Sequence, residues 1–285
     1  MTTNYGTYFL GHAPVEIQRL IEQADYQRGL TKDFLSRAGL TRGMRVLDLG
    51  CGPGDVSLVA AELVGPTGRV TGVDQSAEVV RVGEGRAAAA GLTNCQFAIA
   101  QLADWVEHSH HPLQGERFDA VIGRMVLMYL PRPSALLQCV ARMLRPGGIV
   151  AFQEIFIEPF SCKPRCELAQ WCAERIRDAF VYAGRDLTFG LELPRLFREA
   201  GLPAPDTRVE ARVELGAQAD GWAQLTHAMR AFLPAIVASG SARREDVDIE
   251  TLEQRLRTEA ACISPVLIGP ALVGAWARTP GAQLS

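Results

Sequence analysis

Hydrophobic and polar positions alternate in type along residues 43–153: short apolar runs are followed by segments with helical spacing. A short buried run bounded by turn residues is typical of a strand, and apolar positions three and four apart are typical of a helix. Helices between successive strands imply right-handed crossovers and a parallel sheet. The predicted strands are residues 45–49, 69–73, 95–99, 118–122 and 149–153, and the predicted helices are 56–64, 77–90 and 134–144.

The segments on either side of this alternation follow other patterns. Residues 14–38 carry apolar stripes at helical spacing and predict one or two helices ahead of the first strand, placed to form a lid. Residues 155–187 are rich in aromatic residues and interrupted by proline and glycine, which indicates an insertion that caps the sheet. Further along, we predict a helix at 191–200, a strand at 207–215, mostly helix at 219–263 and a final edge strand at 270–277.

The chain is therefore expected to be one α/β unit with additions. Its predicted parts are a helical lid (1–42), a sheet-forming core (43–154), a cap insertion (155–187) and a segment that completes the sheet with helical additions on the substrate side (188–285).

A glycine-rich turn joins the first predicted strand to its helix. Gly50, Gly52 and Gly54 alternate, and Asp55 stands where the dinucleotide fingerprint G-x-G-x-x-G has its third glycine. The second strand is followed by an acid, Asp74. Such a strand–turn–helix unit holds an adenosine-bearing cofactor at the carboxyl ends of the strands. A carboxylate suits a helix N-cap but is a poor neighbour for a pyrophosphate, so the turn favours a cofactor with an adenosine and no phosphate.

These segments resemble the motifs of the class I S-adenosylmethionine (SAM) dependent methyltransferases. The run 46–55 resembles motif I, Asp74 resembles the ribose-binding acid, and 118–124 and 144–150 continue the resemblance in the right order. The resemblance implies a Rossmann-like sheet of seven strands, mostly parallel, with an antiparallel last strand. It also implies methyl transfer from SAM to an O, N or C atom of a small molecule, as in the ubiquinone/menaquinone and natural-product branch.

The resemblance also assigns cofactor contacts. The glycine turn would hold the methionine part of SAM through backbone amides and the helix N-terminus, Asp48 would support its amino group, and Asp74 would accept hydrogen bonds from the ribose diol. Gln101 stands where the family usually has an adenine-binding acid, with Asp104 as the alternative. The expected cofactor contacts are Tyr8, Asp48, Gly50, Cys51, Gly52, Asp74, Gln75, Gln101, Leu102 and Arg124.

Four residues are candidates for chemistry. Arg124 begins the loop after the fourth strand, beside the expected place of the methyl group, where it would bind an anionic group or pair with a surface acid. Glu154 follows the fifth strand, as a general base, a substrate anchor or a cap of the next segment. His12 and His227 lie in the lid and in the helical additions, where a histidine is either a base or structural. The reaction needs mostly alignment and desolvation, which fits the lack of a strong catalytic constellation.

Other residues extend or limit this interpretation. Tyr8 and its aromatic neighbours would either close over a sulfonium or pack on the core. Arg19 and Gln23 are one helical turn apart and are expected to point into the same site. Neither the histidines of the 108–111 segment nor the cysteines of 162–172 have partners at metal spacing, so no metal site is expected.

Composition narrows the class of protein. The net charge of −3 gives no electrostatic reason to expect nucleic acid, and the longest apolar stretches are too short for a membrane span. Seven scattered cysteines and the lack of a secretory signal at the start of the sequence predict a cytoplasmic protein.

The oligomeric state stays open, with a homodimer among the options. The alternative function is SAM binding without methyl transfer, as in a cyclisation or a binding module. A nicotinamide oxidoreductase is disfavoured by Asp55 and by the order of the motifs.

Overall fold

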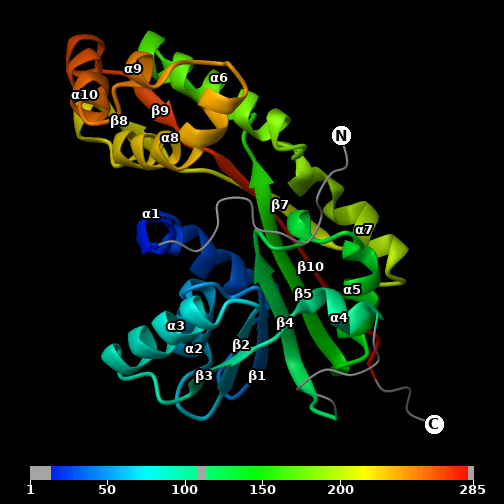
Figure 1. Ribbon diagram of the computed structural model, residues 1–285. Helices are drawn as coiled ribbons and strands as arrows, with labels where there is room; N and C mark the ends of the chain where they lie inside the picture. The colour runs from blue at the N-terminus through cyan, green and yellow to red at the C-terminus, as the bar shows by residue number, and fades with distance from the viewer. Residues whose placement is uncertain (1–13, 108–112, 114, 159, 282–285) are drawn as a thin grey trace.

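A seven-stranded sheet organises the computed structural model, which describes residues 14–107, 113, 115–158 and 160–281 (Figure 1). The strand order is β3-β2-β1-β4-β5-β10-β7, and among these strands only β10 runs antiparallel to both of its neighbours. The predicted α/β sheet with an antiparallel last strand is confirmed. The strands are β1 (Arg45–Leu49), β2 (Arg69–Asp74), β3 (Cys95–Ile99), β4 (Phe118–Arg124), β5 (Leu144–Phe156), β7 (Asp206–Glu210) and β10 (Ala271–Arg278).

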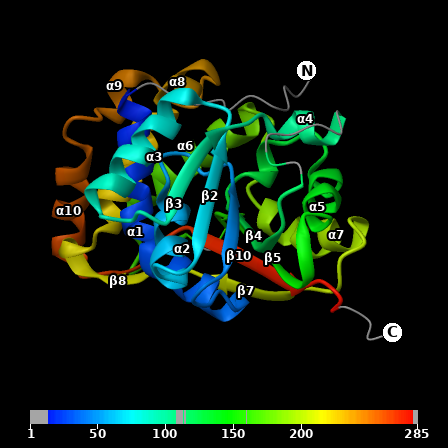
Figure 2. The same cartoon turned by 90° about the horizontal axis from the view of Figure 1, so that it is seen from below.

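Helices cover both faces of this sheet, as Figure 2 shows from below. Helices α1 (Pro14–Ala38) and α2 (Asp55–Val64) pack on one face through Phe34 and Val59, and α3 (Ala77–Ala89) packs against β2 and β3. The opposite face carries α4 (Leu102–Glu107), α5 (Pro133–Ala141) and α7 (Leu193–Glu199). Val46, Leu47 and Leu49 of β1 are fully buried, because a parallel strand between two helical layers exposes neither face.

A second, smaller layer stands over the carboxyl ends of β4 and β5 (Figure 1). We call it the cap: helices α6 (Glu167–Tyr182), α8 (Gly221–Ala238), α9 (Arg244–Val247) and α10 (Leu252–Ile263), with an antiparallel sheet of β6 (Ser161–Lys163), β9 (Val266–Ile268) and β8 (Val213–Leu215). The cap has its own apolar core, in which Trp222, Ile236 and Leu256 are fully buried. Helix α1 lies between the cap and the main sheet.

The structure corrects several predicted elements. The single strand at 207–215 is two strands, β7 and β8, which belong to different sheets. The predicted edge strand at 270–277 is β10, an interior strand between β5 and β7, so β7 forms the edge. The sheet of the cap was not predicted, because strands of three residues are too short to show a period. The N-cap of α2 is Gly54, and Asp55 is the first residue of the helix, where it pairs with Arg86.

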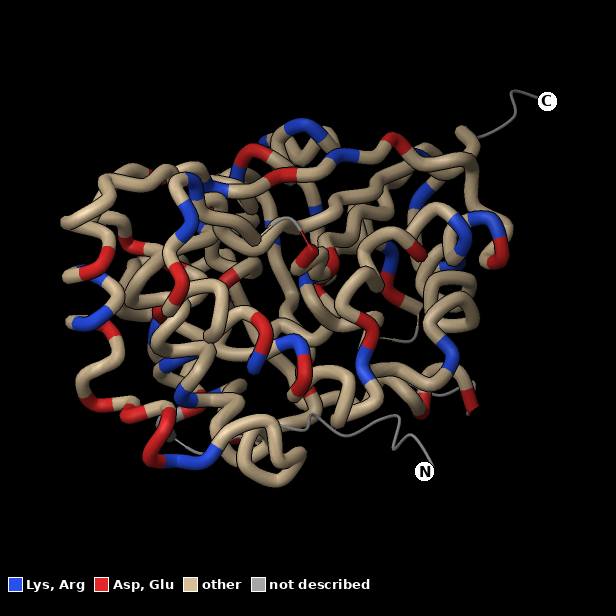
Figure 3. Tube along the Cα trace, turned by 90° about the horizontal axis from the view of Figure 1, so that it is seen from above, with Lys and Arg blue, Asp and Glu red and all other residues tan. Residues whose placement is uncertain are grey.

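Three short 3₁₀ helices complete the described elements: η1 (Leu127–Tyr129), η2 (Phe189–Glu192) and η3 (Gly216–Gln218). Acidic and basic positions are interspersed along the chain (Figure 3). Within the described residues, the helices are too short or too polar to cross a bilayer.

Candidate cofactor and substrate site

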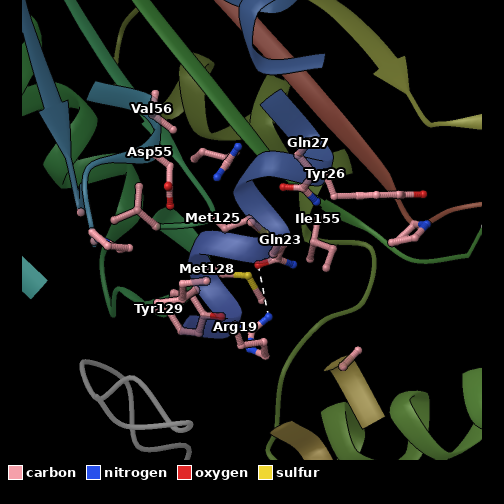
Figure 4. A pocket seen from close by; sticks show the side chains of 18 of the residues that line it. Arg19, Gln23, Tyr26, Gln27, Asp55, Val56, Met125, Met128, Tyr129 and Ile155 are labelled. Atoms are coloured by element: carbon pink, nitrogen blue, oxygen red, sulfur yellow. Dashed lines mark hydrogen bonds between the residues drawn. The ribbon is translucent and has the colours of Figure 1, made fainter. Parts of the chain in front are cut away.

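One cavity of about 260 Å³ lies between α1, the carboxyl ends of β1, β2 and β4, and the cap (Figure 4). Eight of the ten predicted cofactor contacts line it. They are Gly50, Cys51, Gly52, Asp74, Gln75, Gln101, Leu102 and Arg124. Segments at the carboxyl ends of four strands, β1, β2, β3 and β4, are thereby brought together at one edge of the sheet, as the topology requires.

The glycine turn after β1 depends on backbone conformations that only glycine adopts easily. Gly50, Gly52 and Gly54 have φ angles of +61°, +52° and +88°. A Cβ added to Gly50 would lie 2.4 Å from Cγ2 of Val126, whereas a Cβ added to Gly52 would meet nothing within 4 Å. The turn is therefore pressed against the loop after β4 on one side and leaves open space in front of Gly52 on the other.

The amides of this turn are already used inside the protein. The Cys51 amide donates to the Val73 carbonyl at 3.0 Å, and the Gly54 amide donates to the Cys51 carbonyl at 3.0 Å. The Gly52 amide donates to Oδ2 of Asp74 at 3.0 Å. Three amides of the turn therefore have partners inside the protein, and the predicted role of the turn and the helix N-terminus in holding a carboxylate stays a prediction.

Asp74 is held at the end of β2 by two backbone donors. Its Oδ2 accepts from the Gly52 amide, and its Oδ1 accepts from the Ser76 amide at 3.0 Å. Each carboxylate oxygen can accept a further hydrogen bond. The carboxylate is thereby oriented in advance, and it lines the cavity where a diol would be recognised.

Asp48 and Arg124 lie beside the turn on the α1 face of the sheet. Asp48 is only 1% exposed and lies behind the cavity wall; its Oδ2 accepts from the Ser57 hydroxyl at 2.6 Å. Burial raises the pKa of Asp48 to about 7, and its Oδ1 has no partner among the described residues. Arg124 lines the cavity and donates to Oγ1 of Thr31 at 2.8 Å. Burial lowers the pKa of Arg124, while Asp55 and Asp48 oppose that shift.

Glu154 holds the loop after β4 rather than reaching the cavity. Met125, which lines the cavity, has a φ of +50°, a conformation that residues other than glycine rarely adopt. Oε1 of Glu154 accepts from the next two amides, those of Val126 at 3.0 Å and Leu127 at 2.8 Å. The side chain is fully buried, and burial raises its pKa to about 8. The geometry therefore does not support Glu154 as a general base or substrate anchor and favours a positioning role.

His227, the predicted histidine that the structure describes, does not line the cavity. Nδ1 of His227 on α8 lies 2.8 Å from Oε2 of Glu22 on α1, at the seam between the two helices and outside the cavity lining. His12 and Tyr8 lie outside the described residues, so their roles stay predictions. No group of His, Cys, Asp and Glu within the described part of the chain is arranged to hold a metal ion.

The part of the cavity under the cap is mostly apolar. Its wall is formed by Met128, Ile155, Ile157, Phe160, Ile176, Phe180, Leu225, Ala228 and Phe232. Helix α1 adds Arg19, Gln23, Tyr26 and Gln27. The first two were expected from their spacing, whereas Tyr26 and Gln27 were missed. Gln27 continues the same spacing by one more turn, so the spacing places it on the same face of the helix but does not show whether that face meets a cavity or solvent.

Comparison with known proteins identifies the family. Residues 40–201, more than half of the chain, match the model of a methyltransferase domain. The chain belongs to the SAM-dependent methyltransferase family. The predicted SAM cofactor and methyltransferase activity are confirmed by this membership.

Individual relatives of this methyltransferase cover parts of it. The trans-aconitate 2-methyltransferase of Azoarcus sp. is 34% identical over 136 residues, which is 48% of this chain and 49% of the relative. The demethylmenaquinone methyltransferase of Geobacillus stearothermophilus is 30% identical over 190 residues, 60% of this chain and 75% of the relative. The YcgJ protein of Bacillus subtilis superimposes with a TM-score of 0.54 at 17% identity, covering 89% of this chain and 100% of that one, which shows the shared fold.

The residues present fit SAM. The missing Cβ of Gly52 leaves room in front of the turn, and the carboxylate of Asp74 has acceptor capacity left for a ribose diol. Val79 and Leu102 offer apolar surface beyond Asp74 for a purine ring. Arg124 is a cation on the same side of the cavity, suited to a carboxylate.

Proposed function

We propose that this methyltransferase acts on a small molecule that is enclosed between the glycine turn and the cap. The observation that carries the proposal is a single cavity that runs from Gly52 and Asp74 to Phe160 and Phe232 of the cap side. Such continuity lets methyl donor and acceptor meet in a place shielded from water, where alignment and desolvation lower the barrier.

We assign the cofactor contacts as follows. Asp74 would hold the ribose hydroxyls, Gln101 and Leu102 would border the adenine, and Arg124 would hold the methionine carboxylate. Asp48, whose Oδ1 is unpaired behind the turn, would support the ammonium through water. SAM, when bound, supplies a methyl group on a sulfonium that is already activated towards an O, N or C nucleophile.

The chain's own residues then contribute position and shielding. Glu154 fixes the loop that carries Met125 and Met128 against the cavity. The apolar cap side excludes water from the acceptor. The carboxylates that line the cavity within the described residues, Asp55 and Asp74, both lie on the cofactor side, so proton removal from the acceptor is not assigned to a residue here.

We further propose that the protein works in the cytoplasm on small molecules and not on nucleic acid. All seven cysteines are free thiols, which suits a reducing compartment. The net charge of −3 gives no electrostatic reason to expect a polyanion, and acidic and basic positions are interspersed along the described part of the chain (Figure 3). We keep as a proposal the division into a lid (1–42), a core (43–154), a cap insertion (155–187) that supplies α6 and β6 of the cap, and substrate-side additions (188–285) that supply its other elements. A homodimer stays a prediction.

The test is a calorimetric titration with SAM, S-adenosylhomocysteine (SAH) and NADH, followed by a substrate screen with labelled SAM. We expect micromolar binding of SAM and SAH, no binding of NADH, and label transferred to a small molecule. Absence of SAM and SAH binding by folded protein would overturn the cofactor site. Binding without formation of SAH in any reaction would revive the alternative in which the cofactor is not a methyl donor.

A further inference from the structure

Helix α1 presents a polar stripe to the otherwise apolar part of the cavity. Arg19, Gln23 and Gln27 follow one another at one-turn spacing and all line the cavity. Figure 4 shows Gln23 on the side of α1 that faces Met128 and Ile155. The substrate space therefore has one polar edge, on α1, and an apolar body, under the cap.

The charge of Arg19 is compensated within the helix. Its Nη2 and Nε lie 2.6 and 2.8 Å from the two carboxylate oxygens of Glu16, and the two side chains are only 11% and 7% exposed. Arg19 also donates from Nη1 to Oε1 of Gln23 at 3.3 Å. Because this oxygen of Gln23 is the acceptor, its Nε2 is left as a donor. Arg124, the other cation of the described lining, stands by the glycine turn near Asp48 and Asp55.

The side-chain oxygen of Gln27 is buried without a hydrogen-bond partner among the described residues. Its side chain is 4% exposed, it lines the cavity, and its Oε1 is buried with no partner in the described structure. Burying an amide oxygen without a hydrogen bond costs free energy, so this side chain at the cavity wall favours a ligand that donates the missing hydrogen bond. An amide can both donate and accept, and rotation about its last bond exchanges the two groups.

We propose, on the basis of the proposed function, that Gln23 and Gln27 select an uncharged substrate by binding its hydroxyl or carbonyl oxygen while its apolar body lies against the cap. The two amides are neutral and match a neutral oxygen function. A carboxylate would lose its hydration in this space without gaining an uncompensated cation on the cap side, so it is rejected. The substrate class is therefore an uncharged, oxygenated apolar molecule.

Two probes with the same ring system and different head groups test the proposed substrate class. The SAH-loaded protein is titrated at pH 7 with 1-naphthol, which is neutral, and with 1-naphthoate, which is ionised. We expect 1-naphthol to bind about tenfold more tightly or better, because the anion pays for dehydration. Equal or tighter binding of 1-naphthoate, or no binding of 1-naphthol, would overturn the proposal. The titrations are repeated without SAH, so that a failure to bind SAH counts against the proposed function alone.

Leucine variants then test the two amides. Gln23→Leu and Gln27→Leu should each weaken 1-naphthol binding about threefold to tenfold, the effect of one neutral hydrogen bond, and leave SAH affinity unchanged. Naphthalene, which has no oxygen, should bind these variants as tightly as the unmodified protein or more tightly. Gln18→Leu, an exposed glutamine on the same helix, is the matched control and should change nothing. Equal losses for naphthalene and 1-naphthol would mean that packing, not hydrogen bonding, is responsible, and would overturn the assignment.

Discussion

The two halves of the cavity differ in which atoms form their walls: mainly backbone in the cofactor half and side chains in the cap half. The cofactor half is made by backbone: glycines at positive φ, strand ends, and a loop held through its amides by Glu154. The cap half is made by side chains from helices far apart in the chain, such as Phe180 of α6 and Phe232 of α8, whose ring centroids are 4.8 Å apart. A site built from backbone tolerates few residue types at each position, whereas an apolar wall tolerates many.

From that difference we expect the cofactor half to be more constrained in sequence than the cap half. The family match covers residues 40–201, which include the cofactor side and α6 of the cap but omit α1, α8 and α10. A fixed cofactor needs fixed geometry, and a new substrate needs only new side chains on the cap and lid. We therefore expect substitutions on the cofactor side to remove binding of SAH and substitutions on the cap side to change only the acceptor.

The largest effect is expected from Gly52→Val. The branched side chain would fill the open space in front of the turn, and SAH affinity should fall more than about 100-fold because overpacking a ligand site leaves no room to relax. Calorimetry measures the loss. Gly91→Val is the matched control: it has a φ of +68°, open space around its Cβ and a surface position, so it carries similar backbone strain without touching the cavity. Retained SAH binding in Gly52→Val would mean that the cofactor site is misplaced.

The second-largest effect is expected from Asp74→Ala. The variant removes the acceptor of a ribose diol and also the anchor of the Gly52 amide, so SAH binding should weaken by about 1–3 kcal/mol. Asp74→Asn, which keeps one carbonyl acceptor, should lose less. Asp33→Ala, an exposed acid on α1, serves as the control. An affinity of Asp74→Ala equal to that of the control would rule out the ribose role.

The contrast between the cofactor half and the cap half also separates the residues that the sequence could predict from those that it could not. Gly50, Gly52 and Asp74 were found because the elements that place them are neighbours in the chain and in the sheet. The predicted edge position of the strand with Leu272 and Val273 was wrong, because an apolar run does not show which strands lie on either side of it. Gln27 was missed although its spacing from Gln23 is regular, because a polar residue on a helix faces solvent or a cavity with the same pattern.

A change on the cap side should separate transfer from cofactor binding. Ala228→Trp adds a large side chain to the apolar wall on α8, so we expect methyl transfer to fall about tenfold or more while SAH affinity stays the same. Labelled-methyl assays and calorimetry measure the two quantities. Ala238→Trp, at the exposed end of the same helix, should leave both unchanged. A loss of SAH binding in Ala228→Trp would contradict the division of the cavity into two halves.

The role of Glu154 is a case that the sequence alone does not decide. Its place at the end of β5 was expected, but a base and an anchor look alike until the partners are known, and these partners, the Val126 and Leu127 amides, come from the preceding crossover. The distinction therefore depends on tertiary structure. A stability measurement across pH tests the anchoring role.

The smallest effect expected is a pH dependence of stability. Burial raises the pKa of Glu154 from 4.5 to about 8, so the folded protein binds a proton that the unfolded chain has released between these values. The stabilisation is complete below pH 4.5 and is lost as the pH rises through 8, with a slope of up to about 1.4 kcal/mol per pH unit. Asp48, raised to about 7, adds a parallel fall at lower pH.

Urea unfolding between pH 5 and 8 measures this slope in the unmodified protein and in Glu154→Gln. The glutamine oxygen can still accept from the Val126 and Leu127 amides, so the variant should fold, but it cannot titrate. Its unfolding free energy should fall less steeply with pH and should equal or exceed that of the unmodified protein at pH 8. Asp48→Asn should flatten the lower part of the profile in the same way. Identical slopes in the unmodified protein and Glu154→Gln would mean that Glu154 is ionised in the folded state at pH 5 to 8, and a charged carboxylate next to the cavity would reopen its assignment as a base.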